Sequence, residues 1–383
     1  MSTFYVSKSG NDSNNGATSG TAKLTIGAAV GLAVAAVGAG IGTNVITVGD
    51  GTYTETITYS LSNLTIKSTS SDRTAVIITQ SSGDTFLLAK GTTGNVFQHL
   101  TIQNTDADAT DNGIYGANGG SGSHASFTVE DCIFDCQSAA VNYSYGSKFR
   151  RTKFLVNGGD DGSNVYAIRN GTGADGATQD IESCLFVGWD KQTVTGTSHT
   201  TIKNCTFILD ASTQSTSYIV YLGGTNNEIY NSIAYGGATS VDFGFRIHSA
   251  GSTQKMKNLI SFGATGTAFS GNSGDTVVAQ LEDNGDVTTD GNAIFTSIGS
   301  AGITDDYTIN ADGLAYGRGL AAELPSHGND VDGNAFDSSS PNIGCYATVA
   351  SGWTAGTCAG VAHGNITSVD GVAKSSIASI NGV

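Results

Sequence analysis

Basic side chains are scarce in this chain. Its 383 residues include 17 Lys and Arg against 33 Asp and Glu, which gives a formal net charge of −16 at pH 7. Nucleic acids need Lys and Arg to match their phosphates, so this balance argues against a nucleic-acid partner. The charge also disfavours nonspecific attraction to anionic membranes or polyanionic sugars. A site for a polyanion would therefore need a local cationic cluster or a bound cation.

Cysteine is sparse as well, and neither a CxxC pair nor a zinc-finger spacing occurs among Cys132, Cys136, Cys184, Cys205, Cys345 and Cys358. Three of the six occupy one position of the repeat described below and are interpreted as small buried hydrophobes. Of these, Cys184 and Cys205 are the expected neighbours, and a disulfide between them stays open. A local bridge between Cys345 and Cys358 stays open too.

Long apolar runs are missing from the first part of the chain. Residues 26–41 are apolar but short and interrupted by glycine, which is too weak for a membrane span. No basic segment followed by an apolar one precedes them. We therefore expect neither a signal peptide nor insertion into a membrane.

What the chain does contain is a short recurring phrase. An apolar residue is followed by two polar positions, often ending in Asn, then by Cys, Leu or Thr, one further residue, and Phe or Ile. Clear copies read VEDCIF at 129–134, IESCLF at 181–186 and IKNCTF at 202–207. The fourth position falls at residues 64, 100, 132, 152, 184, 205, 232 and 259. An internal period of this size indicates a stacked repeat.

The repeat predicts an all-β fold, a single-stranded right-handed parallel β-helix. Each phrase alternates like a strand with one buried face, and no helical segment separates the copies. Such strands can stack coil upon coil. The fourth position should then form one interior column, and the last position an aromatic ladder of Phe134, Phe154, Phe186 and Phe207. The 53 Gly and only 2 Pro agree, because Gly and Asn tolerate the positive φ of tight corners.

Both ends resemble the pectin-lyase-like β-helix superfamily. The opening match reads YVSKSGNDSNNG at 5–16, LTIGAAV at 24–30 and VGDGTY at 48–53, and the closing match reads DVDGN at 330–334 and PNIGCY at 341–346. The Ala-rich stretch from Thr25 to about Val37 predicts a helix that caps the open first rung. The resemblance covers residues 4–347 and implies the fold. It leaves activity open, because the superfamily includes lyases, hydrolases, epimerases, adhesins and virion proteins.

The tail has a different pattern. ITSVDGV at 366–372 is echoed by IASINGV at 377–383, which resembles short C-terminal tails of tailed-phage structural proteins. The alternative is two short strands around an Asp-Gly or Asn-Gly turn. We therefore divide the chain into an N-terminal loop and cap helix (1–44), β-helix coils (45–264), looser terminal coils with a closing segment (265–347), and a tail (348–383).

Few residues qualify for lyase chemistry, which by resemblance needs a Lys or Arg base and an Arg or Ca²⁺ to neutralise a uronate carboxylate. If Thr152 points inward, strand alternation turns Arg151 and Lys153 outward, where they could lie beside Arg169 or Lys203. Arg150 would then face inward, which suggests a register break or a corner. The alternative for such outward cations is solubilising decoration.

Three further groups carry hypotheses. Arg246 and His248 should share one face of a strand and could serve a lyase. Asp160 and Asp161 are interpreted as a loop with a candidate Ca²⁺ site rather than as paired hydrolase acids, because adjacent strand residues point opposite ways. Candidate sugar-stacking tyrosines, if not part of the internal ladder, are Tyr143, Tyr145, Tyr166 and Tyr221.

The function expected from these patterns is a virion surface component of a tailed phage, of fibre, spike or decoration type. It would be structural or glycan-binding, and its partners would be other virion proteins, further copies of itself as a homotrimer, or a cell-surface polysaccharide. The alternative is a polysaccharide lyase or glycoside hydrolase that acts on an acidic polysaccharide, and a second alternative is an extracellular bacterial adhesin. No cofactor is certain, and Ca²⁺ is the one candidate.

Overall fold

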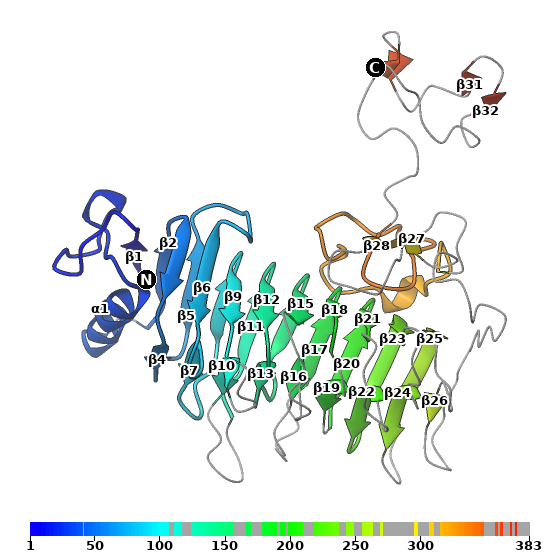
Figure 1. Ribbon diagram of the computed structural model, residues 1–383, viewed down its shortest axis with the longest axis horizontal. Coiled ribbons are helices and arrows are strands. Elements are labelled where there is room, and N and C mark those ends of the chain that lie inside the picture. Colours follow the sequence, from blue (N-terminus) through cyan, green and yellow to red (C-terminus); the bar gives the residue numbers. More distant parts are fainter. Residues whose placement is uncertain are drawn as a thin grey trace.

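The computed structural model describes most of the chain up to residue 347. The described residues are 1–40, 42–106, 111–116, 124–156, 166–169, 178–189, 192–196, 198–209, 218–236, 243–248, 255–262, 269–270, 295–297, 306–309, 315–347, 357–358, 361–362, 368–369 and 372–373. Within them the fold is a parallel β-helix with one N-terminal helix, as the repeat predicts (Figure 1).

Each coil contributes strands to three faces. The first face pairs β1 (Ser2–Val6), β2 (Asn44–Val48), β5 (Leu64–Ser68), β8 (Asn95–Gln98), β11 (Phe127–Glu130), β14 (Lys148–Arg150), β17 (Gln179–Glu182), β20 (Thr200–Lys203), β23 (Glu228–Tyr235) and β25 (Lys255–Phe262). The second face pairs β3 (Gly51–Thr54), β6 (Val76–Gln80), β9 (Thr101–Asn104), β12 (Ile133–Cys136), β15 (Lys153–Val156), β18 (Leu185–Val187), β21 (Thr206–Ile208) and the second halves of β23 and β25.

The third face is a separate nine-stranded sheet of β4 (Ile57–Tyr59), β7 (Phe86–Leu88), β10 (Asn112–Gly116), β13 (Ala139–Asn142), β16 (Ile168–Arg169), β19 (Gln192–Gly196), β22 (Tyr218–Gly223), β24 (Phe243–His248) and β26 (Phe269–Ser270). All pairings within these three faces are parallel and one coil apart.

The corner between the first and second faces explains the recurring phrase. Its third position has positive φ in seven successive coils: His99, Asp131, Arg151, Ser183, Asn204, Asn231 and Asn258. Outside glycine, Asn, Asp and His adopt this left-handed conformation most readily, which is why the phrase so often ends its polar pair with them. The chain therefore turns between two inward residues, and strand alternation breaks at this point.

The interior columns are those that the sequence predicts. Leu100, Cys132, Thr152, Cys184 and Cys205 are fully buried in successive coils. Along the last position of the phrase, the rings of Phe134, Phe154, Phe186 and Phe207 stack with centroids 5.0, 4.7 and 4.7 Å apart. Cys184, Cys205 and Cys345 are free thiols, so neither disulfide left open by the sequence is present.

The N-terminal end is closed by α1 (Ile26–Gly38), one residue displaced from the expected helix. Thr25 caps it, and its hydroxyl accepts a hydrogen bond from the Ala28 amide. Ile26, Ala29 and Ala33 bury the inner side of α1 against the core. The segment before it is more than a loop, because β1 forms the first rung on β2. Among the described helices, none combines the length and apolarity of a membrane span.

The closing segment, residues 315–347, lies outside the stack of coils. It folds back beside β18, β21 and β23 (Figure 1) and covers the outer side of the second face. Its Val331, Ile343 and Tyr346 pack in a second hydrophobic cluster. The coil side of that cluster consists of the outward residues Leu185, Val187, Ile208, Ile233 and Ile260. The described parts of 295–309 form an antiparallel pair, β27 (Phe295–Ser297) with β28 (Asp306–Ile309).

One copy of the phrase was placed in the wrong register. Leu64 was expected to share a column with Leu100. However, β5 pairs with β8, so Leu64 lies on the first face, whereas Leu100 lies at the corner after that face. The true partner of β9 in this coil is β6, which follows after a longer connection. In the tail, β31 (Ser368–Val369) pairs antiparallel with β32 (Val372–Ala373), and β29 (Thr357–Cys358) pairs with β30 (Val361–Ala362).

Candidate functional site

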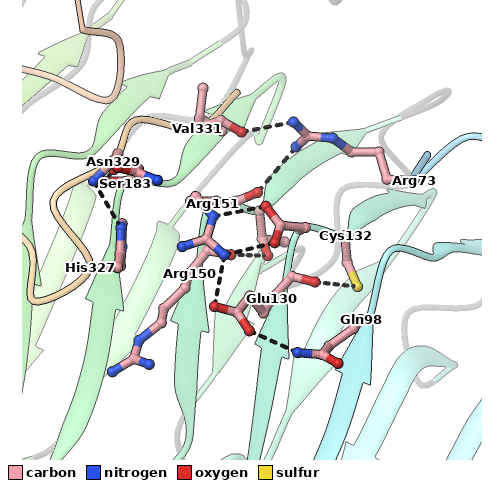
Figure 2. Close-up of polar contacts among 12 residues, drawn as sticks. Arg73, Gln98, Glu130, Cys132, Arg150, Arg151, Ser183, His327, Asn329 and Val331 are labelled. Atoms are coloured by element: carbon pink, nitrogen blue, oxygen red, sulfur yellow. Dashed lines mark hydrogen bonds and ion pairs between the residues drawn. The ribbon is translucent and has the colours of Figure 1, made fainter. Parts of the chain in front are cut away.

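Charged side chains gather where the closing segment crosses the corner between the first and second faces (Figure 2). Arg151 lies at the centre, with φ of 47°. Its guanidinium donates to both carboxylate oxygens of Asp131, at 2.8 and 2.7 Å, and to Glu130 at 2.7 Å. The hydrogen bond to Asp131 is the main cause that raises the pKa of Arg151. These bonds stabilise Arg151 in a positive-φ backbone conformation that a residue with a bulky side chain otherwise avoids.

The neighbouring residue Arg150 points outward and pairs with Glu182, with 3.3 Å between Nε and the carboxylate. Glu182 in turn accepts hydrogen bonds from the amide and hydroxyl of Ser326, at 3.1 and 2.9 Å. Next to it, His327 accepts from the Asn329 amide through Nδ1 at 3.2 Å. Burial, followed by the positive charge of Arg151, lowers the pKa of His327 to about 4. His327 is therefore neutral at pH 7.

A third group ties the closing segment to an early coil. Asp332 accepts from Arg73 at 3.0 Å and from Lys153 at 2.8 Å. Arg73 also donates to the backbone oxygens of Arg151 and Val331, at 3.1 and 2.8 Å (Figure 2). Residues more than 250 positions apart in sequence thus meet at one corner.

This corner fastens the closing segment rather than offering charge to a ligand. Its four cations, Arg73, Arg150, Arg151 and Lys153, are matched by four carboxylates in the described part of the chain. Arg169 does not lie beside Arg151 and Lys153, as the sequence had suggested, because it belongs to β16 of the nine-stranded sheet. Arg150 points outward, because the chain turns at Arg151, which is the corner that the sequence had suggested as one explanation.

A second candidate site runs along the outer face of the nine-stranded sheet. Ile114, Val141, Ile168, Val194, Val220 and Phe245 point into the core. The residues that follow them are in register and point outward: Tyr115, Asn142, Arg169, Thr195, Tyr221 and Arg246. Arg169 and Arg246 are three rungs apart, about 14 Å at the usual strand spacing.

Each of these arginines is stacked against two tyrosines. The Arg169 guanidinium lies 5.9 Å from the ring centre of Tyr143 and 5.2 Å from that of Tyr166. Arg246 lies 4.8 Å from Tyr218 and 5.6 Å from Tyr221. Arg246 also donates a hydrogen bond to the Tyr218 hydroxyl. Cation–π contacts of this kind orient a guanidinium against the aromatic rings.

The nine strands of this sheet differ from the strands of the other two faces in that none of them carries a carboxylate. They contain Arg169 and Arg246 but no Asp or Glu. The strands of the first face carry Glu130, Asp180, Glu182 and Glu228 together with six Lys and Arg. In a chain of net charge −16, the strands of the nine-stranded sheet thus place no carboxylate opposite Arg169 and Arg246, which leaves the local field at these arginines favourable to an anion.

The structure thus brings together residues that the sequence had assigned to different roles. Arg169 and Arg246, considered as lyase groups, share a sheet with Tyr143, Tyr166 and Tyr221, considered as sugar-stacking groups. Tyr145 is buried rather than outward. The contact of Arg73 with Asp332 could not be predicted from the sequence, because these residues are 259 positions apart.

Some predicted positions remain untested. Asp160 and Asp161 lie outside the described residues, as does the side chain of His248, whose backbone ends β24. Within the described part of the chain, no group of three or more His, Cys, Asp or Glu side chains could hold a metal ion. The candidate Ca²⁺ site therefore stays a prediction.

The fold places the chain among the parallel β-helix proteins, and solved structures agree. Pectate lyase Pel9A is similar over 91% of this chain and 96% of its own length, with a TM-score of 0.54 and 14% identity. A rhamnogalacturonan lyase is similar over 84% and 97%, with a TM-score of 0.53 and 12% identity. No protein-family model and no curated sequence matches the chain. It has the pectin-lyase-like β-helix fold, and the likeness extends to fold alone.

Proposed function

We propose that this chain binds an acidic polysaccharide along the outer face of the nine-stranded sheet. The observation that carries the proposal is the pair of tyrosine-stacked arginines, Arg169 and Arg246, on strands without a carboxylate. Guanidinium groups bind carboxylates through two parallel hydrogen bonds, and tyrosine rings stack on sugar rings. Because the two arginines are about 14 Å apart along the helix axis, an extended polymer can contact both.

The choice of ligand class follows the names of two structures with the same fold, a pectate lyase and a rhamnogalacturonan lyase. The net charge of the chain sets a condition that the proposal meets. A polyanion must approach a molecule of charge −16, so binding requires a face where cations prevail. The corner of Figure 2 does not provide one, because its cations are already paired.

Binding measurements on a double variant test the proposal. Arg169→Gln/Arg246→Gln should lose affinity for polygalacturonate or alginate by at least about tenfold, since a hydrogen bond to a charged group contributes about 1.5–3 kcal/mol. The matched control is Lys148→Gln/Lys255→Gln, which removes two cations from ion pairs on the first face. Equal affinity of both double variants and the wild type for every acidic polymer would rule the proposal out.

Cleavage of the bound polymer is a second candidate function, favoured by the contact of Arg246 with the Tyr218 hydroxyl. An arginine that neutralises a uronate carboxylate makes the adjacent C5 proton easier to remove, and tyrosine can transfer protons. A lyase would release an unsaturated product that absorbs in the ultraviolet. Its absence with polygalacturonate, alginate and chondroitin as substrates would leave binding without catalysis.

The virion hypothesis stays a prediction. The first copy of the tail phrase overlaps the short strand pair β31–β32. Such a pair agrees with the alternative interpretation of the tail, two short strands around a turn. Neither of the two lyase likenesses concerns a virion protein. Mass spectrometry of purified particles for this chain would decide between a virion component and an extracellular protein.

A further inference from the structure

A group of buried polar atoms without partners lies beside Arg169. The atoms are Oδ1 of Asn142, Oη of Tyr145, and both ring nitrogens of His124. These side chains are 8%, 6% and 9% exposed. Among the residues that the structure describes, none gives these atoms a hydrogen bond. Buried polar groups are nearly always paired with protein, water or ligand, so four such atoms in one place need an occupant.

The three residues form one cluster at the start of the arginine-bearing column. The His124 ring stacks on Tyr143 at 5.8 Å and meets the edge of Tyr145 at 6.3 Å. Tyr143 is also one of the two rings against Arg169. Asn142 lies on the outer side of β13, in register between Tyr115 on β10 and Arg169 on β16. Asn142 is thus linked to Arg169 by strand register, and His124 is linked to it through the ring of Tyr143.

We propose that Asn142, Tyr145 and His124 form a subsite for the hydroxyl groups of one sugar unit of the bound polysaccharide. This inference rests on the proposed function. It adds a site for sugar hydroxyls at one end of the binding face. A sugar hydroxyl both donates and accepts, and so does this set. The Asn142 oxygen accepts, the Tyr145 hydroxyl does both, and a neutral His124 ring has one donor and one acceptor.

The arginines and the hydroxyl subsite should recognise different features of the polysaccharide, and this difference can be tested. Arg169 and Arg246 recognise charge, which every acidic polymer supplies. The hydroxyl subsite recognises the configuration of the sugar next to Arg169, because a site built to hydrogen-bond a hydroxyl discriminates strongly against a sugar that cannot supply it. Uronates that differ only in hydroxyl configuration should therefore bind with different affinities.

Three nearly isosteric variants, Asn142→Leu, Tyr145→Phe and His124→Phe, test the subsite through two readouts. Removing an unpaired buried polar atom relieves a cost, so the melting temperature without sugar should stay the same or rise. Affinity for the preferred polyuronate should fall about tenfold per variant, and the discrimination between epimeric polymers should shrink. A residue with a merely structural role would give the opposite result for stability.

The matched control is Asn95→Leu. Asn95 is also buried, but its side chain accepts from the Leu64 amide and donates to the Leu61 oxygen, both at 3.0 Å. This variant should lower the melting temperature and leave affinity unchanged. The subsite is wrong if the three variants keep wild-type affinity and discrimination while Arg169→Gln/Arg246→Gln loses binding, since the buried atoms then hold water only. If the arginine variant also binds normally, the proposed function fails as well.

Discussion

Single residues at the first corner decide where the chain turns. Seven non-glycine residues there have positive φ, and six of them are Asn, Asp, His or Ser. Arg151 is the exception, and it is the residue with two carboxylate partners, Asp131 and Glu130. The ion pairs offset the cost of an unfavourable backbone conformation. Alternation alone placed Arg150 inside, which suggested a register break or a corner, and the structure shows a corner at Arg151.

His327 gives the corner a pH dependence of known sign. Its pKa is about 4 in the folded protein and about 6.5 when it is exposed, so the unfolded chain takes up a proton first as pH falls. Stability is therefore lost as pH falls from about 6.5 to about 4. The loss should be about 1–2 kcal/mol, less than the full pKa difference implies, because solvent partly screens the site.

The variant His327→Gln should remove this loss. Denaturant unfolding of wild type and variant between pH 7 and pH 4 gives the difference between the two chains, in which the titration of shared carboxylates cancels. The free energy of unfolding of the variant, relative to that of the wild type, should rise as pH falls. A difference that stays constant over this range would show that His327 does not titrate with folding.

At the scale of elements, the closing segment is held by both packing and charge. Outward positions of the second face change character along the helix. Gln103 and Asp135 on β9 and β12 give way to Leu155, Val187 and Ile208 on the next coils. The apolar half is the half that the closing segment covers. The strand LFV at 185–187 is apolar on both sides, which was a signal in the sequence for a second covering layer.

An asparagine ladder adds hydrogen bonds to the same contact. Asn258 donates to Asn231 at 2.9 Å, and Asn231 donates to Asn204 at 3.3 Å. The same side chains donate to the closing segment, to the backbone oxygens of Arg318, Leu320 and Asn342. The corner residues therefore serve the turn and the closing segment together.

Removing the charge of Asp332 should loosen this segment without unfolding the coils. In Asp332→Asn, Arg73 and Lys153 lose their carboxylate, so amide hydrogen exchange in residues 326–347 should accelerate about fivefold, as expected for about 1 kcal/mol. Asp337→Asn is the control, because Asp337 accepts hydrogen bonds only from its own turn among the described residues. Equal exchange rates in the two variants would show that the ion pairs do not hold the segment.

For the whole molecule, the sequence predicted the solenoid and its interior but not its surface. The interior columns depend on side chains one coil apart, such as Phe154 and Phe186, and a repeat reveals those. The contacts of Arg73 with Asp332, or of Asn204 with Asn342, join segments that share no pattern. The candidate site could be predicted only in part. Its arginines and tyrosines were named individually, but only the register of the nine-stranded sheet places them together.

The charge distribution indicates which face of the molecule a polyanion would bind. Carboxylates dominate overall, and the described strands of the nine-stranded sheet are free of them. A polyanion should therefore be repelled from most of the surface and accepted on this sheet. Raising the salt concentration should weaken binding, since the contacts at Arg169 and Arg246 are ionic.

The most direct test of this account is a crystal structure of the chain with a bound uronic acid oligosaccharide. The account predicts a sugar chain that runs along β13, β16, β19, β22 and β24, with carboxylates paired to Arg169 and Arg246 and one sugar beside Asn142. Sugar bound instead over the first face, or at the corner around Arg151, would contradict it.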